Sequence, residues 1–266
     1  MSRIAVHSIE NFYDDENEKY ITRAQKKRLR KQKLQQKKLV NILDIEPRTE
    51  NQTKAFEAFD DGHNLLLHGV AGTGKTFVSL YLALDDIFNG EDMKRSVTIV
   101  RSVVPTREIG FLPGKEKDKT AVYEAPYKSI ITELTGRGDG YEILKQRGII
   151  DFTTTSFLRG TTIDNSIIIV DECQNMTFHE LDSIITRAGI NTSIIFSGDF
   201  RQTDLNKPWD QSGISEFMKI LKKISSFKDI EFDYQDIVRS GLVRDYIIAK
   251  DDFYEQNFST PSYASA

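Results

Sequence analysis

The feature that most constrains the fold is a glycine-rich stretch at residues 69–76, GVAGTGKT, which matches the pattern G-x-x-x-x-G-K-[ST] in full. It lies between an apolar run at 64–67 and a helical pattern at 75–88. Glycine relieves Cβ crowding, so backbone N–H groups in such a stretch can converge on phosphate oxygens at the N-terminus of the next helix. The stretch, called the phosphate loop below, therefore predicts a strand, a loop and a helix in this order.

Two side chains of the phosphate loop carry its expected chemistry. We expect Lys75 to hold the β- and γ-phosphates of a nucleotide and Thr76 to ligate Mg²⁺ through its hydroxyl. The predicted nucleotide-binding residues of the loop are Gly69, Gly72, Thr73, Gly74, Lys75 and Thr76. The alternative, a structural glycine-rich turn, is disfavoured by the full motif in its strand-and-helix context.

After Pro47 the chain alternates short β-branched runs with helical patterns. Strands are expected at 64–67, 97–101, 149–152, 167–170, 193–196 and 230–232. Helices are expected near 53–59, 75–88, 127–134, 178–187, 214–223 and 236–249, and the glycine-rich residues 136–140 as a surface loop. The continuous apolar run at 167–170 is typical of a strand buried on both faces. The alternation predicts a three-layer α/β domain with a mainly parallel central sheet.

Acidic and polar residues follow two of these expected strands. Asp171 and Glu172 come directly after the run at 167–170, where Asp171 is expected to hold the hydration shell of Mg²⁺ and Glu172 to act as general base on a water. The alternative is an ordinary acidic strand end, which the pairing with the phosphate loop disfavours. After the next strand, residues 197–202 read SGDFRQ, and Gln202 is expected to reach the attacking water or the γ-phosphate. Cys173 is expected to be a small packed side chain.

The net charge of −4 conceals a basic segment near the N-terminus. Ten Lys and Arg residues and no acid lie between Lys19 and Lys38, while the residues before and after this segment are both net acidic. The segment has high helix propensity and few apolar positions, which predicts a solvated helical arm. Two interpretations stay open: an arm that contacts nucleic-acid phosphates, or a tail that lies against the acidic body. The residues proposed for the first are Lys26, Lys27, Arg28 and Arg30.

Composition excludes several other classes of protein. A single cysteine and four histidines without a cluster argue against structural disulfides and structural zinc. No run approaches about 20 apolar residues, and residues 1–15 lack the apolar core of a signal peptide. We therefore expect a cytoplasmic protein without a membrane partner. Its expected parts are an acidic segment at 1–18, the basic arm at 19–46 and a nucleotide-binding domain at 47–266.

Taken together, the phosphate loop, the Asp-Glu strand end and the G-D-x-x-Q stretch resemble the motor core of superfamily-1 helicases. The closer resemblance, from about Pro47 to Tyr246, is to the PhoH family of ATPases. It depends on segments that read TENQ at 49–52, Arg101 followed by GFLPG at 110–114, RGT at 159–161, IVDECQN at 169–175 and DIVR at 236–239. It implies a P-loop NTPase domain of the RecA-like type that uses ATP and Mg²⁺.

The resemblance also implies roles for residues outside the phosphate loop. Gln52 would lie near the adenine, Arg101 and Arg159 would face nucleic acid, and Arg239 would approach the nucleotide. The alternatives are that Gln52 begins a helix, that Arg101 is a solvated strand end, and that Arg239 pairs with Asp236 one helical turn away. The sequence departs from the family pattern at Ser102, Thr161, Cys173 and Ser240, which leaves the nucleic-acid contacts open.

Too few residues follow Gln202 for the second motor domain that a monomeric superfamily-1 helicase closes around its nucleotide. We therefore expect self-assembly into a ring, which the resemblance to PhoH-like ATPases implies is a hexamer, in which a neighbour's arginine stabilises charge on the γ-phosphate. Arg239 is the first candidate and Arg201 the second. The expected function is Mg²⁺-dependent ATP hydrolysis stimulated by RNA or single-stranded DNA. A nucleotide-gated nucleic-acid-binding module with little turnover and a small-molecule kinase are the alternatives.

Overall fold

The computed structural model describes residues 40–90, 94–102, 116–155, 158, 160, 162–199 and 208–258. By its internal contacts the chain divides into a unit that ends at Asn41 and a unit that begins at Ile42. The acidic segment and residues 19–39 of the predicted basic arm lie outside the described residues, whereas residues 40–46 are described and form neither helix nor strand. Their boundaries therefore remain predictions.

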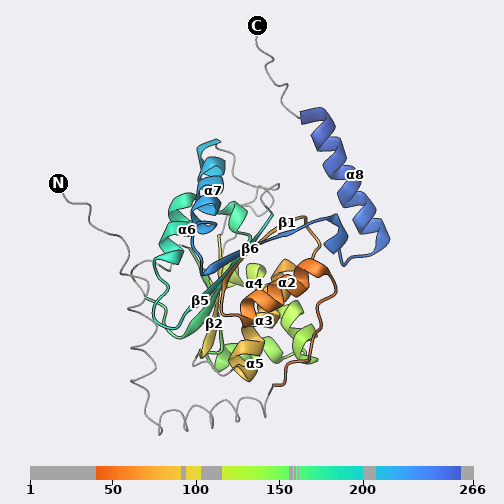
Figure 1. The fold of residues 1–266 in the computed structure, drawn as a ribbon. Helices are drawn as coiled ribbons and strands as arrows, with labels where there is room; N and C mark the ends of the chain where they lie inside the picture. Colours follow the sequence, from red (N-terminus) through yellow and green to blue (C-terminus); the bar gives the residue numbers. More distant parts are fainter. Residues whose placement is uncertain are drawn as a thin grey trace, which may run out of the picture. The chain divides into compact units, whose positions relative to one another are not determined.

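A six-stranded sheet forms the centre of the second unit, and every neighbouring pair of its strands is parallel (Figure 1). The strand order is β3-β2-β4-β5-β1-β6. The strands are β1 (Asn64–Gly69), β2 (Ser96–Arg101), β3 (Ile150–Thr154), β4 (Ser166–Asp171), β5 (Ser193–Gly198) and β6 (Phe227–Phe232). All six strands of the sequence prediction are present, and the α/β class with a parallel sheet is confirmed.

Helices cover both faces of this sheet, as the three-layer prediction requires (Figure 1). On one side lie α2 (Glu50–Asp60), α3 (Lys75–Asn89), α4 (Glu116–Thr135) and α5 (Gly140–Gln146). On the other lie α6 (Phe178–Ile185) and α7 (Pro208–Leu221), and α8 (Gly241–Phe258) follows the last strand. Within the described part of the chain, no helix combines the length and apolarity needed to cross a membrane.

The core on the α6 and α7 side shows how the sheet holds these helices. Ile168 and Phe196 project from β4 and β5 and pack with Leu181 of α6 and Phe217 of α7, all of them buried. The rings of Phe196 and Phe217 pack edge to face, with their centres 5.2 Å apart. Burial of each such side chain stabilises the fold by about 1.5–3 kcal/mol, so this layer is fixed against the strands.

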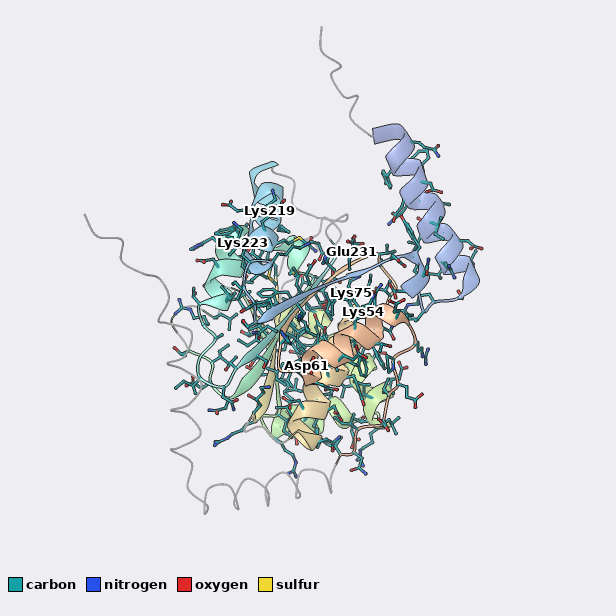
Figure 2. All side chains as sticks on the ribbon, in the orientation of Figure 1. Lys54, Asp61, Lys75, Lys219, Lys223 and Glu231 are labelled. Carbon is teal, nitrogen blue, oxygen red and sulfur yellow. The ribbon has the colours of Figure 1, made fainter. Side chains whose placement is uncertain are left out.

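The charged residues labelled in Figure 2 differ in their exposure to solvent. Lys219 and Lys223 near the end of α7 and Glu231 on the edge strand β6 are exposed. Lys75 is the exception among the labelled lysines, because it is buried at the beginning of α3. A buried lysine is unusual unless it has partners, so its surroundings mark the site described next.

Two helix predictions were wrong in detail, and one helix was not predicted. The helix expected at 236–249 begins only at Gly241, because Asp233 caps a short 3₁₀ turn at Tyr234–Asp236 and the chain after it is not helical. The helix α4 continues through Pro126 instead of beginning after it. The predicted surface loop at 136–140 ends where the unpredicted helix α5 begins, at Gly140.

Candidate nucleotide-binding site

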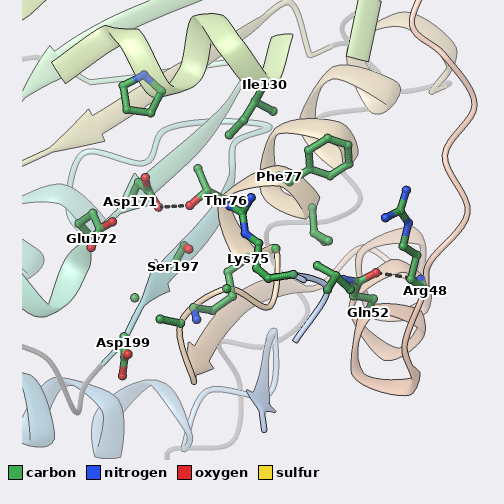
Figure 3. Close-up of a pocket in the computed structure, with 18 of the residues that line it drawn as sticks. Arg48, Gln52, Lys75, Thr76, Phe77, Ile130, Asp171, Glu172, Ser197 and Asp199 are labelled. Carbon is green, nitrogen blue, oxygen red and sulfur yellow. Dashed lines mark hydrogen bonds between the residues drawn. The ribbon is translucent and has the colours of Figure 1, made fainter. Parts of the chain in front are cut away.

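The carboxyl ends of neighbouring strands bring together residues that are far apart in the sequence. The strands β2, β4, β5 and β1 end at Arg101, Asp171, Gly198 and Gly69, and they are neighbours in this order. Ligands of parallel α/β sheets bind at this edge. A cleft of about 710 Å³ lies here, lined by the phosphate loop and by the residues that end or follow these strands (Figure 3).

The phosphate loop has a backbone that only glycine accommodates at its beginning. Gly69 has φ 112°, and a Cβ there would lie 2.0 Å from the carbonyl oxygen of Phe232. Gly72 and Gly74 also have positive φ angles, of 78° and 87°. The glycines therefore allow both the turn and the close approach of β6, which leaves the loop open as a cradle for phosphate.

Lys75 extends back over the phosphate loop. Its Nζ donates hydrogen bonds to the carbonyl oxygens of Gly69 and Val70, at 2.9 and 2.7 Å. Burial lowers the pKa of Lys75, and the nearby carboxylates, Asp199 and Glu172 foremost, oppose this shift. The loop thus holds a buried cation at the N-terminus of α3, an arrangement that favours an anion.

Thr76 and Asp171 form the second part of the site. The Thr76 hydroxyl donates to Asp171 Oδ1 at 2.9 Å, and the Tyr127 hydroxyl donates to Asp171 Oδ2 at 2.9 Å. Burial and the adjacent Glu172 raise the pKa of Asp171, while the bonds from Tyr127 and Thr76 lower it. No role for Tyr127 follows from the sequence, because nothing in its neighbourhood marks it as part of a site.

The donor set of this pair fits magnesium. A hydroxyl and a carboxylate are hard oxygen donors, and Mg²⁺ is bound in phosphate-transferring sites by one or two such groups together with the phosphates. The described residues contain no group of three or more His, Cys, Asp or Glu side chains that could hold a metal alone. A hydroxyl and a carboxylate are therefore a donor set that suits a cation also bound by phosphate oxygens.

Glu172 is directed into the cleft by a strained backbone. Its φ and ψ of 52° and 40° are left-handed, which is uncommon for a residue other than glycine and concentrates at functional sites. Gln174 Nε2 donates to Glu172 Oε2 at 2.6 Å, and Gln174 Oε1 accepts from the backbone N–H of Asp199 at 3.1 Å. Gln174 thus joins the acidic strand end to the loop after β5, a function the sequence did not indicate.

Gln52 lies at the opposite end of the cleft, in the first turn of α2 (Figure 3). Its Nε2 donates to the carbonyl oxygen of Thr73 at 3.0 Å, and its Oε1 accepts from the backbone N–H of Arg48 at 2.8 Å. The alternative that Gln52 merely begins a helix is therefore incomplete, since its amide also contacts the phosphate loop. The apolar side chains Phe56 and Phe77 line this end.

Arg101 also lines the cleft and is half-buried, so it is not a solvated strand end. Its guanidinium lies 5.7 Å from the ring centre of Tyr123. Burial raises the pKa of the Tyr127 phenol, and the nearby Arg101 opposes this rise. This places Arg101 beside the carboxylates of β4, with which it is in register at Asp171.

Arg239 lines the cleft of its own chain. The backbone N–H of Val238 donates to the carbonyl oxygen of Gly72 at 3.2 Å, and a Cβ on Gly72 would lie 3.2 Å from Arg239 Cγ. The predicted alternative, an ion pair with Asp236 on one helix, is wrong, because both residues precede α8. Asp236 instead accepts a hydrogen bond from Asn51 Nδ2 at 2.8 Å.

The remaining predicted residues lie outside the described residues, and the structure does not test them. They are Arg159, Arg201, Gln202, Lys26, Lys27, Arg28 and Arg30. Gln202 and Arg201 follow Asp199, the last described residue after β5.

A comparison of the sequence with known protein families agrees with this site geometry. A profile of the family described as PhoH-like protein matches residues 44–251. The chain belongs to the PhoH-like protein family. The match includes every strand of the sheet and every described residue of the cleft, so this member of the family is a P-loop NTPase with a nucleotide-binding architecture.

Curated relatives of this PhoH-like chain are longer than the chain itself. A PhoH-like protein of Bacillus subtilis is 36% identical over 184 residues, which are 69% of this chain and 56% of that protein. A PhoH-like protein of Synechocystis is 30% identical over 216 residues, 81% of this chain and 64% of that protein. The chain therefore spans between about half and two thirds of these relatives.

Among solved structures, the large terminase of a thermophilic bacteriophage aligns with a TM-score of 0.46 and 12% identity. The alignment covers 79% of this chain and 50% of that chain. The assignment to the PhoH-like family accordingly depends on the sequence profile and on the site, not on this likeness.

Proposed function

We propose that this PhoH-like protein binds ATP with Mg²⁺ in the cleft and hydrolyses it, in a cycle stimulated by RNA or single-stranded DNA. The observation that carries the proposal is the meeting of Lys75, the Thr76–Asp171 pair and Glu172 in one cleft at the carboxyl edge of the sheet. A small-molecule kinase must exclude water from the γ-phosphate, so a glutamate base for water, together with Gln202, fits hydrolysis better than transfer to a small molecule.

In this proposal the phosphates of ATP occupy the phosphate loop, and the adenine lies at the end of the cleft that Gln52 lines. Lys75 exchanges its loop carbonyl partners for phosphate oxygens, and the backbone N–H groups of the loop bind the same anion. Gln52, whose amide is already fixed by Thr73 and Arg48, offers its remaining donor and acceptor positions to adenine. Phe56 and Phe77 provide apolar surface for the ring.

Magnesium, when bound through Thr76 and Asp171, neutralises charge on the phosphate oxygens. Glu172 accepts a proton from the attacking water, whose oxygen forms the new bond to the γ-phosphorus as the bond to ADP breaks. Gln174 holds Oε2 of Glu172, so the other carboxylate oxygen, Oε1, is the one we assign to the proton. Gln202 follows the Asp199 loop that Gln174 holds, and we propose that it orients the same water.

We propose that Arg239 acts on the nucleotide bound by its own chain, because it lies against the phosphate loop of that chain. It has no hydrogen-bond or ion-pair partner within the described ranges, and it is exposed at the cleft. A guanidinium free to turn towards the γ-phosphate suits the stabilisation of developing charge. Arg201 is then the candidate for the arginine that a neighbouring subunit supplies.

Self-assembly into a ring and contact with nucleic acid complete the proposal. Five large apolar side chains of α8 are exposed, and such patches are typical of interfaces; they are Leu242, Val243, Tyr246, Phe253 and Tyr254. The run of lysines and arginines between Lys19 and Lys38 supports binding of a phosphate backbone.

The first experiment measures free phosphate released from ATP with no acceptor added. Glu172→Gln is expected to lower kcat by about 10²–10⁴-fold while nucleotide binding persists, and Glu57→Gln on the exposed face of α2 is the control. Undiminished turnover in Glu172→Gln would contradict the role of Glu172. Binding of ATP without turnover in the unaltered protein would favour a nucleotide-gated binding module.

The second experiment separates the nucleic-acid proposal from hydrolysis. ATP turnover is measured with and without RNA and single-stranded DNA at two salt concentrations. Stimulation that disappears at the higher salt is expected if cations of the chain contact the phosphate backbone. Turnover that neither polymer changes at low salt would leave hydrolysis intact and remove the nucleic-acid partner.

A further inference from the structure

A tyrosine that belongs to no recognised motif contacts the carboxylate at the centre of the site. Tyr127 of α4 is fully buried, and its ring packs against Phe152 of β3 with ring centres 5.8 Å apart. Its hydroxyl donates to Asp171 Oδ2 at 2.9 Å, the oxygen that Thr76 does not contact. A buried hydroxyl at this position therefore has one described acceptor on β4.

The two oxygens of Asp171 have different partners. Oδ1 accepts from Thr76 at the beginning of α3, and Oδ2 accepts from Tyr127 in α4. The terminal torsion of an aspartate is broad and roughly two-fold, so packing alone does not fix which oxygen faces the cation site. A donor on Oδ2 selects one of these orientations and leaves Oδ1 beside Thr76.

Arg101 extends this contact into a chain of three residues. Burial raises the pKa of the Tyr127 phenol, and the nearby Arg101 guanidinium opposes this rise, which makes the phenol O–H a stronger donor. Arg101 is itself held over the ring of Tyr123 and paired in register with Asp171 across β2 and β4. Helix α4 and strand β2 thus provide the residues beside Oδ2 of Asp171, whereas the beginning of α3 provides the hydroxyl that contacts Oδ1.

We propose that Tyr127 is a positioning residue that orients the Asp171 carboxylate for Mg²⁺, and thereby sets the magnesium requirement of nucleotide binding. The inference depends on the proposed function, since it assigns Asp171 to the metal. Groups that orient a metal ligand from behind typically contribute about 10–100-fold to metal affinity.

The test compares Tyr127→Phe with Tyr141→Phe as a matched control. Tyr141 is also buried and donates its hydroxyl to a carboxylate, Glu124 Oε2, at 2.8 Å. Both variants lose one phenol hydroxyl and keep the ring. Tyr141 and Glu124 are absent from the cleft, so only Tyr127→Phe should change the response to magnesium.

Binding of a fluorescent ATP analogue is titrated with MgCl₂, starting in EDTA. In the absence of magnesium, both variants are expected to bind the analogue as the unaltered protein does. The magnesium concentration at half-maximal enhancement of binding is expected to rise about 10-fold in Tyr127→Phe and to stay unchanged in Tyr141→Phe. An unchanged midpoint in Tyr127→Phe, or an equal rise in both variants, overturns the inference.

Two further measurements keep the inference testable. If Tyr127→Phe is unfolded at room temperature, the titration is repeated in the cold in sucrose, which favours the compact state, and the same criterion applies. In the Asp171→Asn background, Tyr127→Phe should cause no additional rise, because the two residues act as a unit; a full additional rise overturns the inference. Nucleotide binding by the unaltered protein that ignores magnesium contradicts the proposed function instead.

Discussion

Replacement of Gln174 by alanine should test how Glu172 is held in place. Gln174 is 4% exposed and provides both a donor to Glu172 Oε2 at 2.6 Å and an acceptor for the Asp199 backbone N–H at 3.1 Å. Gly198 packs against the same side chain, since a Cβ there would lie 2.6 Å from Gln174 Oε1. The variant thus releases the acidic strand end and the loop after β5 together.

The magnitude follows from the two bonds. A hydrogen bond to a charged group contributes about 1.5–3 kcal/mol and a neutral one about 0.5–1.5 kcal/mol, so Gln174→Ala should destabilise the fold by about 2–4.5 kcal/mol. For a domain of this size, a loss of about 1 kcal/mol lowers Tm by about 2–4 °C. The loss of orientation of Glu172 should lower kcat by up to about 10²-fold, because a general base depends on its position.

The assay combines thermal unfolding, ATP turnover and nucleotide binding, with the exposed Gln146→Ala of α5 as control. We expect Gln174→Ala to have a lower Tm and kcat, with nucleotide affinity preserved because the phosphate loop is untouched. Gly198→Ala should produce the same pattern through the opposite cause, a clash in place of a lost contact. A kcat equal to that of Gln146→Ala would refute the reasoning that Gln174 positions Glu172.

Three further predictions follow from single residues. Gly69→Ala should prevent stable folding, since its Cβ would lie 2.0 Å from the Phe232 carbonyl oxygen, and a soluble protein with unchanged Tm would contradict this. Arg239→Ala and Glu172→Gln, mixed and allowed to co-assemble, should regain no turnover if Arg239 acts within its own chain, whereas recovery would indicate action between subunits. Burial raises the pKa of Asp236, but hydrogen bonds from Asn51, from Thr49 and from backbone N–H groups outweigh it and hold that pKa below its usual 3.8. The stability they provide is present above pH 3.8 and lost as the pH falls through the folded-state pKa, so the Tm difference between the unaltered protein and Asp236→Asn should narrow below about pH 4; a constant difference would contradict it.

Much of the fold could be predicted because its signals are local. The run at 167–170 is apolar at every position and forms the fully buried strand β4, and the phosphate loop has the strand and helix that its motif requires. The beginning of α8 could not be predicted. The chain after Asp236 stays non-helical there and contacts the phosphate loop, where the Val238 N–H donates a hydrogen bond to the Gly72 carbonyl oxygen. A contact between residues so far apart in the chain produces no periodic pattern of apolar residues from which it could be predicted.

The candidate site divides in the same way. Lys75, Thr76, Asp171 and Glu172 could be named from the sequence, because phosphate and magnesium chemistry demands particular residue types next to strand ends. Tyr127 and Gln174 could not be assigned a role, since a tyrosine in a helix and a glutamine after a strand occur in many settings. Their function appears only when α4 and the loop after β5 are packed beside β4.

The sequence by itself determined the class of the fold and the residues that can handle phosphate, because covalent neighbours supply the loop, the helix N-terminus and the acidic strand end. The tertiary structure decided which side chains hold these phosphate-handling residues in place and which part of the cleft Arg101 and Arg239 each contact. Arg101 reaches the carboxylates through the β2–β4 register, and Arg239 reaches the phosphate loop of its own chain through the segment after β6. Both placements depend on strand order, which is a property of the folded sheet and not of any stretch of sequence.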